Sequence, residues 1–329
     1  MITFPSRSLK RAKLASSSLL SASKAAVGYP PRRAGIVALL TLAENMLEHK
    51  LEKASSMALA IAAKCEELSR RKEIDRGLDV PKSCDAVYGI RNRLDAEISL
   101  ILGGVDAAYE SAKKSVKMDG SGKNYEVLGE ACVRGGKSDE AIEALELGLE
   151  AYGVSNCPLR VFLKLSSLLI SSGSFPHLSR SRDVSLLATK KFGSAMAWRL
   201  LGCALSEMDL KGDAEAAMQE SLRIDSFEPV TWGNLSMLVM DGKSDAGDGS
   251  KDGSASRNLD AYVNAKQSLL RDLNDPFLLR QLGSKIVQTG ELDIAEEMLR
   301  KSLAIDGSKN TKAILEDVVR MKGDVNVAV

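Results

Sequence analysis

A Leu-Gly or Leu-Ser pair, followed by an isolated Ala and then by a small residue before Leu, recurs along this chain of 329 residues. Copies begin at Leu128-Gly129, Leu201-Gly202, Leu235-Ser236 and Leu282-Gly283. Gly202 and Ser236 are 34 residues apart, and the 73 residues from Gly129 to Gly202 leave room for one degenerate copy. Such a period predicts stacked helix-turn-helix units, because a single unit cannot bury its own apolar face.

The pattern resembles the tetratricopeptide repeat, a 34-residue unit with the signature W-x2-L-G-x2-Y…A-x3-F…P. Trp198-Arg-Leu-Leu201-Gly202 carries the start of this signature, whereas Ser226 and Gly307 replace the usual final proline. The resemblance implies an all-α fold, namely a right-handed α-α superhelix of about six to seven helical hairpins with a C-terminal capping helix. Gly129, Gly202 and Gly283 are predicted to lie where the two helices of a hairpin touch, because glycine lets two backbones approach closely.

We expect three segments along the chain. Residues 1–34 form a basic, Ser-rich segment that is partly helical, residues 35–309 hold the repeats, and residues 310–329 form the capping helix and tail. An inserted flexible loop is predicted at residues 241–257, where Gly, Asp, Ser and Lys dominate. The N-terminal segment has the composition of a mitochondrial or plastid transit peptide, and it can equally form the second helix of an incomplete hairpin.

Charge and hydropathy exclude several classes of protein. The net charge is +1, but the first 43 residues hold seven basic residues and no acid, so the remainder has 38 basic and 44 acidic residues and a net charge of −6. A mildly acidic body argues against a nucleic-acid partner, which needs a basic face. No apolar run approaches the roughly 20 residues of a membrane-spanning helix, so we expect no membrane span and a cytoplasmic location that includes cytoskeletal or ciliary assemblies.

The sequence contains no recognisable motif for catalysis, cofactor binding or metal binding. The five cysteines show no CxxC spacing, and neither phosphate-binding glycine motif occurs. The Gly-rich insertion begins like a calcium loop at Asp248, but Leu259 stands where the closing Glu should be. His49 and His177 have no companion motif. We therefore expect no enzyme activity, no cofactor and no metal.

The resemblance also implies a binding surface, because the residues two before Trp198 and one and two after it point into the concave groove of such repeats. The surface residues that this gives are Met196, Arg199, Leu200, Asn234, Met237, Phe277, Arg280 and Gln281. Met, Leu and Phe beside two arginines suit a partner segment that is partly apolar and partly acidic, such as an amphipathic helix. The alternative is that Met196, Leu200 and Phe277 pack against the neighbouring hairpin.

The same positions argue against one known specialisation of the family, the clamp that holds the C-terminal carboxylate of heat-shock proteins. The clamp uses Lys, Asn and Arg side chains on three successive first helices, and here only Asn234 matches outright and Arg199 in part, while the cations of the third helix are replaced by Phe277 and Gln281. The sequence thus predicts a non-enzymatic scaffold or adaptor for other proteins within a multiprotein assembly. The alternatives are an RNA-associated helical-repeat protein and an organelle-targeted repeat factor.

Overall fold

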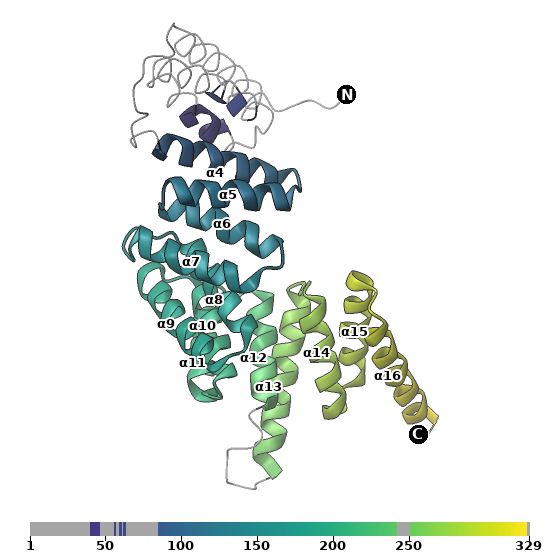
Figure 1. Ribbon diagram of the computed structural model, residues 1–329. Coiled ribbons are helices and arrows are strands. Elements are labelled where there is room, and N and C mark those ends of the chain that lie inside the picture. Colours follow the sequence, from purple (N-terminus) through teal and green to yellow (C-terminus); the bar gives the residue numbers. More distant parts are fainter. Residues whose placement is uncertain are drawn as a thin grey trace, which may run out of the picture. The chain divides into compact units, whose positions relative to one another are not determined.

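The structure, a computed structural model, describes residues 40–46, 56, 59–60, 62–63, 85–241 and 251–327. Almost all of these residues are helical, and the described part of the chain contains no strand (Figure 1). The helices are α4 (Asp85–Ile101), α5 (Val105–Met118), α6 (Gly122–Arg134), α7 (Ser138–Tyr152), α8 (Leu159–Ser172), α9 (Phe175–Phe192), α10 (Ala195–Glu207), α11 (Lys211–Ile224), α12 (Pro229–Asp241), α13 (Lys251–Leu270), α14 (Pro276–Ile286), the 3-10 helix η3 (Val287–Thr289), α15 (Leu292–Asp306) and α16 (Lys309–Val327).

The chain divides into an N-terminal unit, Met1–Val161, and a C-terminal unit, Phe162–Val329, with the boundary in the first turn of α8. Within the N-terminal unit α4 pairs with α5 and α6 with α7; within the C-terminal unit α10 pairs with α11, α12 with α13 and α14 with α15. These pairs are the predicted helical hairpins, so the all-α superhelical repeat fold is confirmed. The predictions for the segment 1–34, His49, Cys65 and Cys84 lie outside the described residues.

Small residues close each hairpin as predicted. A Cβ atom added to Gly129 would lie 2.8 Å from Leu145, one added to Gly202 would lie 2.8 Å from Met218, and one added to Gly283 would lie 2.8 Å from Leu299. Each of these contacts joins the first helix of a hairpin to its second helix. Only glycine permits these helices to pack at this distance, which explains the Leu-Gly pair in these three copies.

A buried serine hydroxyl joins the two helices of three hairpins in the same way. Ser115 Oγ donates a hydrogen bond to the carbonyl oxygen of Gly89 at 2.7 Å, Ser221 Oγ to that of Ala195 at 2.8 Å, and Ser302 Oγ to that of Pro276 at 2.8 Å. In every case donor and acceptor are 26 residues apart and the serine is fully buried. The second helix thereby binds the start of the first, and the polar hydroxyl is satisfied inside the core.

The C-terminal end of the repeat array is covered by α16. Leu315 and Val318 of this helix are buried in the same apolar cluster as Leu279 and Leu299 of the last hairpin. This helix begins at Lys309, and the sequence predicts a capping helix from residue 310. The inserted segment differs more: Asp241 ends α12 and α13 begins at Lys251, inside the predicted loop. Since no proline interrupts the segment, the helix anchored on α12 through Ala261 continues upstream.

Candidate protein-binding groove

The eight predicted groove residues lie on the first helices of three successive hairpins in the C-terminal unit, α10, α12 and α14. Met196 and Phe277 are exposed, with 46% and 57% of their surface accessible. Leu200 is buried, so it packs inside the repeat and offers no surface to a partner. Met237 is half-buried against the apolar cluster of the last hairpins, and Gln281 is half-buried as well. The apolar part of this surface therefore comes mainly from Met196 and Phe277.

Arg199 is held loosely. Its Nε lies 3.8 Å from Glu228 Oε2, too far for a hydrogen bond, and this buried Nε has no hydrogen-bond partner in the described part of the chain. The Glu228 carboxylate is already engaged, because Oε2 accepts the backbone N–H of Thr231 at 2.6 Å in the first turn of α12. A buried donor without a partner costs free energy. The Nε atom itself is enclosed, and 17% of the Arg199 side-chain surface is accessible, so an incoming acceptor can reach the guanidinium only at its exposed part.

Arg280 combines an ion pair with an aromatic contact. Its Nη1 lies 3.5 Å from Asp306 Oδ2, at the end of α15, and its Cζ lies 5.3 Å from the centre of the Phe277 ring. The guanidinium thus lies over an exposed aromatic side chain of the same helix, one turn away. The sequence did not reveal Glu228 or Asp306 as partners of the two arginines, although both acids stand at helix ends, where such groups commonly interact.

Asn234 joins α12 to α10. Its Nδ2 donates to Cys203 Sγ at 3.3 Å, and Cys203 lies one turn beyond Arg199. Burial raises the pKa of the Cys203 thiol to about 11, and the nearby Arg199 charge offsets only part of this effect. At neutral pH the thiol is therefore protonated and acts as a hydrogen-bonding side chain, not as a nucleophile.

The corresponding helices of the N-terminal unit carry charges that bind one another. Arg93 of α4 is buried, with 3% of its surface accessible, and donates to Glu97 Oε1 and to Glu44 Oε1, each at 3.0 Å. Lys123 of α6 also binds Glu44. Burial raises the pKa of Glu97, whereas at Glu44 the effect of burial is outweighed by Lys123 and Arg93, which lower its pKa.

A second cluster in the N-terminal unit centres on Glu126 of α6, which is buried. Its carboxylate accepts Arg160 Nη2 at 2.9 Å and Tyr152 Oη at 3.0 Å. Arg160 Nε binds the same carboxylate, so the pair is bidentate. The charges of this cluster therefore bind one another, in contrast to Arg199 Nε, which is buried without a hydrogen-bond partner in the described part of the chain.

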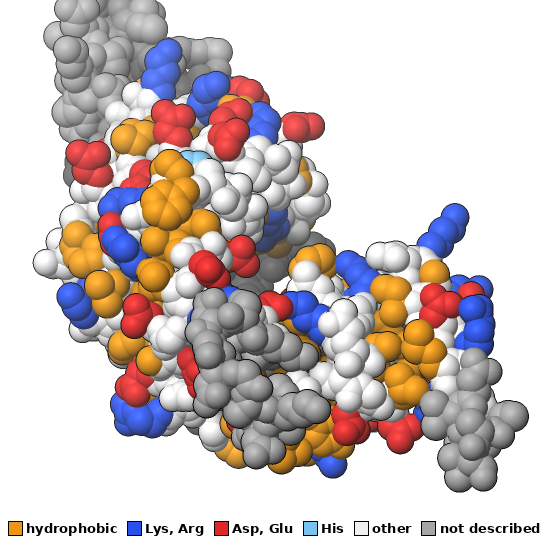
Figure 2. Space-filling model, turned by 90° about the horizontal axis from the view of Figure 1, so that it is seen from below, with side chains coloured by type: hydrophobic (Ala, Val, Ile, Leu, Met, Phe, Trp, Pro, Cys, Tyr) orange, Lys and Arg blue, Asp and Glu red, His pale blue; other side chains and the backbone are white. Residues whose placement is uncertain are grey.

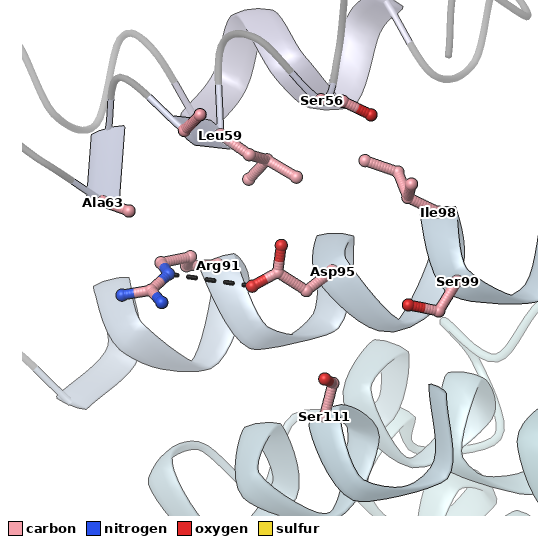
Figure 3. Close-up of a pocket in the computed structure, with 9 residues that line it drawn as sticks. Ser56, Leu59, Ala63, Arg91, Asp95, Ile98, Ser99 and Ser111 are labelled. Atoms are coloured by element: carbon pink, nitrogen blue, oxygen red, sulfur yellow. Dashed lines mark ion pairs between the residues drawn. The ribbon is translucent and has the colours of Figure 1, made fainter. Parts of the chain in front are cut away.

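A cavity of about 380 Å³ lies in the N-terminal unit, between residues 56–63 and the helices α4 and α5 (Figure 3). Leu59 and Ile98 point toward it from opposite sides, and the Arg91–Asp95 ion pair, 3.7 Å long, lies along α4 at its edge. Burial raises the pKa of Asp95, and Arg91 offsets part of that shift. The lining is otherwise of apolar and hydroxyl side chains, and it provides no nucleophile with an adjacent base.

In the part of the chain that the structure describes, the arrangement of metal-ligating and basic side chains bears on whether it binds a metal ion or a nucleic acid. Within the described ranges no three His, Cys, Asp or Glu side chains are grouped so that they could hold a metal ion. Figure 2 shows Lys and Arg intermixed with Asp and Glu on the face it presents, without a continuous basic field. Among the described residues, no helix is both long and apolar enough to cross a membrane.

Successive helical hairpins closed by glycine and serine contacts define a tetratricopeptide-repeat protein. The family model for the C-terminal domain of cilia and flagella-associated protein 70 matches residues 50–329. The chain belongs to this family. No curated protein matches the chain.

Solved structures confirm the fold. The chain is similar to one chain of the APC/C hetero-tetramer Cut9–Hcn1 (16% identity, TM-score 0.52, 86% of this chain and 52% of that one). It is also similar to a tetratricopeptide repeat protein from Parabacteroides merdae (11% identity, TM-score 0.57, 86% and 98%) and to PilF from Pseudomonas aeruginosa (13% identity, TM-score 0.51, 71% and 98%). This chain spans about half the length of the chain that it matches in the Cut9–Hcn1 tetramer. At these identities the similarity concerns the fold, and proteins of this fold generally act as protein-interaction scaffolds.

Proposed function

We propose that this protein is a non-enzymatic scaffold that binds a peptide or helical segment of another protein on α10, α12 and α14. The observation that carries the proposal is Arg199, whose buried Nε has no hydrogen-bond partner in the described part of the chain and lies 3.8 Å from an already engaged carboxylate. The Arg199 side chain keeps 17% of its surface accessible, and an incoming carboxylate would bind the guanidinium from that side.

The exposed apolar side chains define the rest of the partner. Met196 and Phe277 present adaptable apolar surface, and Arg280 lies over the Phe277 ring. Methionine and aromatic side chains accommodate varied apolar groups. The segment that fits this surface therefore alternates acidic and apolar side chains, as one face of an amphipathic helix does.

The assembly in which the protein acts is, on this proposal, ciliary or flagellar. The name of the matching family, cilia and flagella-associated protein 70, supports this location. A cytoplasmic scaffold of the ciliary or cytoskeletal type also agrees with the charge balance of the sequence.

The test is affinity purification from ciliated cells with quantitative mass spectrometry, comparing the wild type with the double variant Arg199→Gln and Arg280→Gln. We expect at least one partner to be depleted about tenfold or more, since a hydrogen bond to a charged group contributes about 1.5–3 kcal/mol. The matched control is Arg223→Gln with Arg300→Gln, two exposed arginines on α11 and α15. Retention of every partner by a folded groove variant would exclude this surface.

A further inference from the structure

The outer face of α13 carries a line of exposed apolar side chains. Leu259, Val263 and Leu270 have 61%, 43% and 70% of their surface accessible. At 100° per residue they lie opposite Ala261 and Ala265, which are buried against α12. The apolar line therefore points away from the hairpin, and it is separate from the groove on the first helices.

The residues of this line are spaced identically whether the helix is followed from its N-terminus or from its C-terminus. Residues 259, 263, 266 and 270 share one stripe, and they are placed symmetrically about the point between residues 264 and 265. Lys266 is the polar member of the stripe, and it is exposed. A surface with this symmetry is complementary to itself about a two-fold axis, as isologous interfaces are.

We propose that the outer face of α13 binds the same face of a second copy of the chain, with the two α13 helices antiparallel. In this arrangement Leu259 faces Leu270 of the second copy, and Val263 packs against the aliphatic stem of Lys266 of the second copy. Lysine stems commonly cover apolar surface while the ammonium group stays in water. Each contact occurs twice because of the two-fold axis.

The charges beside the stripe agree with self-association. Asp260 and Arg271 lie on the same side of the stripe, and Asp260, exposed, has no ion-pair partner in the described part of the chain. Arg271 Nε donates to the carbonyl oxygen of Ser226 at 2.7 Å, which fixes the side chain in place. In the antiparallel pair, the side that carries Asp260 meets the side that carries Arg271 of the second copy. Because Asp260 and Lys266 balance in charge, the face favours neither a strongly basic nor a strongly acidic partner.

The first test is the oligomeric state in solution. Sedimentation velocity of the full chain over a concentration series should show a monomer–dimer equilibrium at micromolar concentrations, because one helix pair buries less than a standard interface. Leu259→Glu with Leu270→Glu should abolish the dimer, whereas Ala216→Glu with Ala304→Glu, on exposed positions of α11 and α15, should retain it. Thermal melts check that each variant is folded. A wild type that stays monomeric, or a dimer that persists in the Leu259→Glu, Leu270→Glu variant, would overturn the proposal.

The second test is the orientation of the two helices. Residues 259 and 270 are about 16 Å apart along α13, so the chain with both Leu259→Cys and Leu270→Cys should form a disulfide-linked dimer under mild oxidation. Leu259→Cys alone should not, since the two copies of residue 259 then lie at opposite ends. Equal cross-linking by Leu259→Cys alone would show a parallel pair and overturn the antiparallel assignment. The wild type under the same oxidation controls for the native cysteines.

Discussion

The first helices of the N-terminal unit and those of the C-terminal unit use their arginines differently. In the N-terminal unit Arg93 binds two carboxylates at 3.0 Å each, and Arg160 binds Glu126 in a bidentate manner. In the C-terminal unit Arg199 and Arg280 lie 3.8 Å and 3.5 Å from the nearest carboxylates. The arginines of the N-terminal unit are bound by short hydrogen bonds, whereas Arg199 and Arg280 are held by longer ion pairs, which an incoming acceptor displaces at a lower cost.

This difference matters because a partner must displace whatever already binds the groove side chains. Opening the Arg93 cluster would leave buried charges without partners, at a cost of several kcal/mol. Displacing the loose contact between Arg199 and Glu228 costs far less, since no hydrogen bond is broken at Arg199 Nε. Hairpins that pack in the same way can therefore carry charges that stabilise the fold in one unit and charges available for binding in the other.

The largest expected effect is that of Arg93→Met. The change removes the donor from Glu44 and Glu97 and should lower the free energy of unfolding by about 3 kcal/mol, as the loss of one partner of a buried ion pair does. Arg91→Met, on the same helix and beside a longer ion pair, is the matched control and should change stability by less than about 1 kcal/mol. Chemical denaturation measures both, and equal effects would show that the N-terminal charges are not a closed cluster.

Glycine-to-leucine changes should affect the two units alike. Gly129→Leu and Gly202→Leu each place a side chain within 2.8 Å of an atom on the opposite helix, so each should destabilise its hairpin by about 2 kcal/mol through overpacking. Gly212→Leu, where an added Cβ meets no atom within 4 Å, is the control for the loss of glycine itself. Thermal denaturation followed by circular dichroism gives the comparison. A markedly smaller loss in one unit would mean that its hairpins are packed differently.

The smallest expected effect on stability is that of Arg199→Met. Its ion pair is 3.8 Å long, and the change removes a buried donor that lacks a hydrogen-bond partner in the described part of the chain, so the free energy of unfolding should change by less than about 1 kcal/mol. Chemical denaturation and a partner-binding assay on the same variant separate a structural role of Arg199 from a binding role. We expect partner binding to fall and the free energy of unfolding to stay the same. A loss as large as that of Arg93→Met would place Arg199 in the structural framework instead.

The hairpins could be predicted from sequence because their contacts depend on residue size at fixed spacing. Gly202 and Met218 meet within one repeat, and the same offset recurs at Gly129 with Leu145 and at Gly283 with Leu299. The resemblance to a known repeat then supplied which helix comes first. The predicted groove residues followed from the alignment of each first helix with the repeat signature. All of them except Leu200 keep part of their surface accessible.

The polar contacts could not be predicted, because they join residues of different hairpins or depend on side-chain conformation. Arg93 and Glu44 are 49 residues apart, and no local pattern links them. Leu200 was predicted to face the groove but is buried, and its apolar side chain gave no sequence signal that separates a groove position from a core position. The start of α13 was missed because composition predicted a loop where helix continues.

The serine contacts also bear on how the chain acquires its structure. Each joins residues only 26 positions apart, and the glycine contacts span fewer than 20. Contacts this local cost little loop-closure entropy, and folding is faster when contacts are local in sequence. A hairpin can therefore close before the next one has been synthesised, and the array can grow from one end as the chain leaves the ribosome.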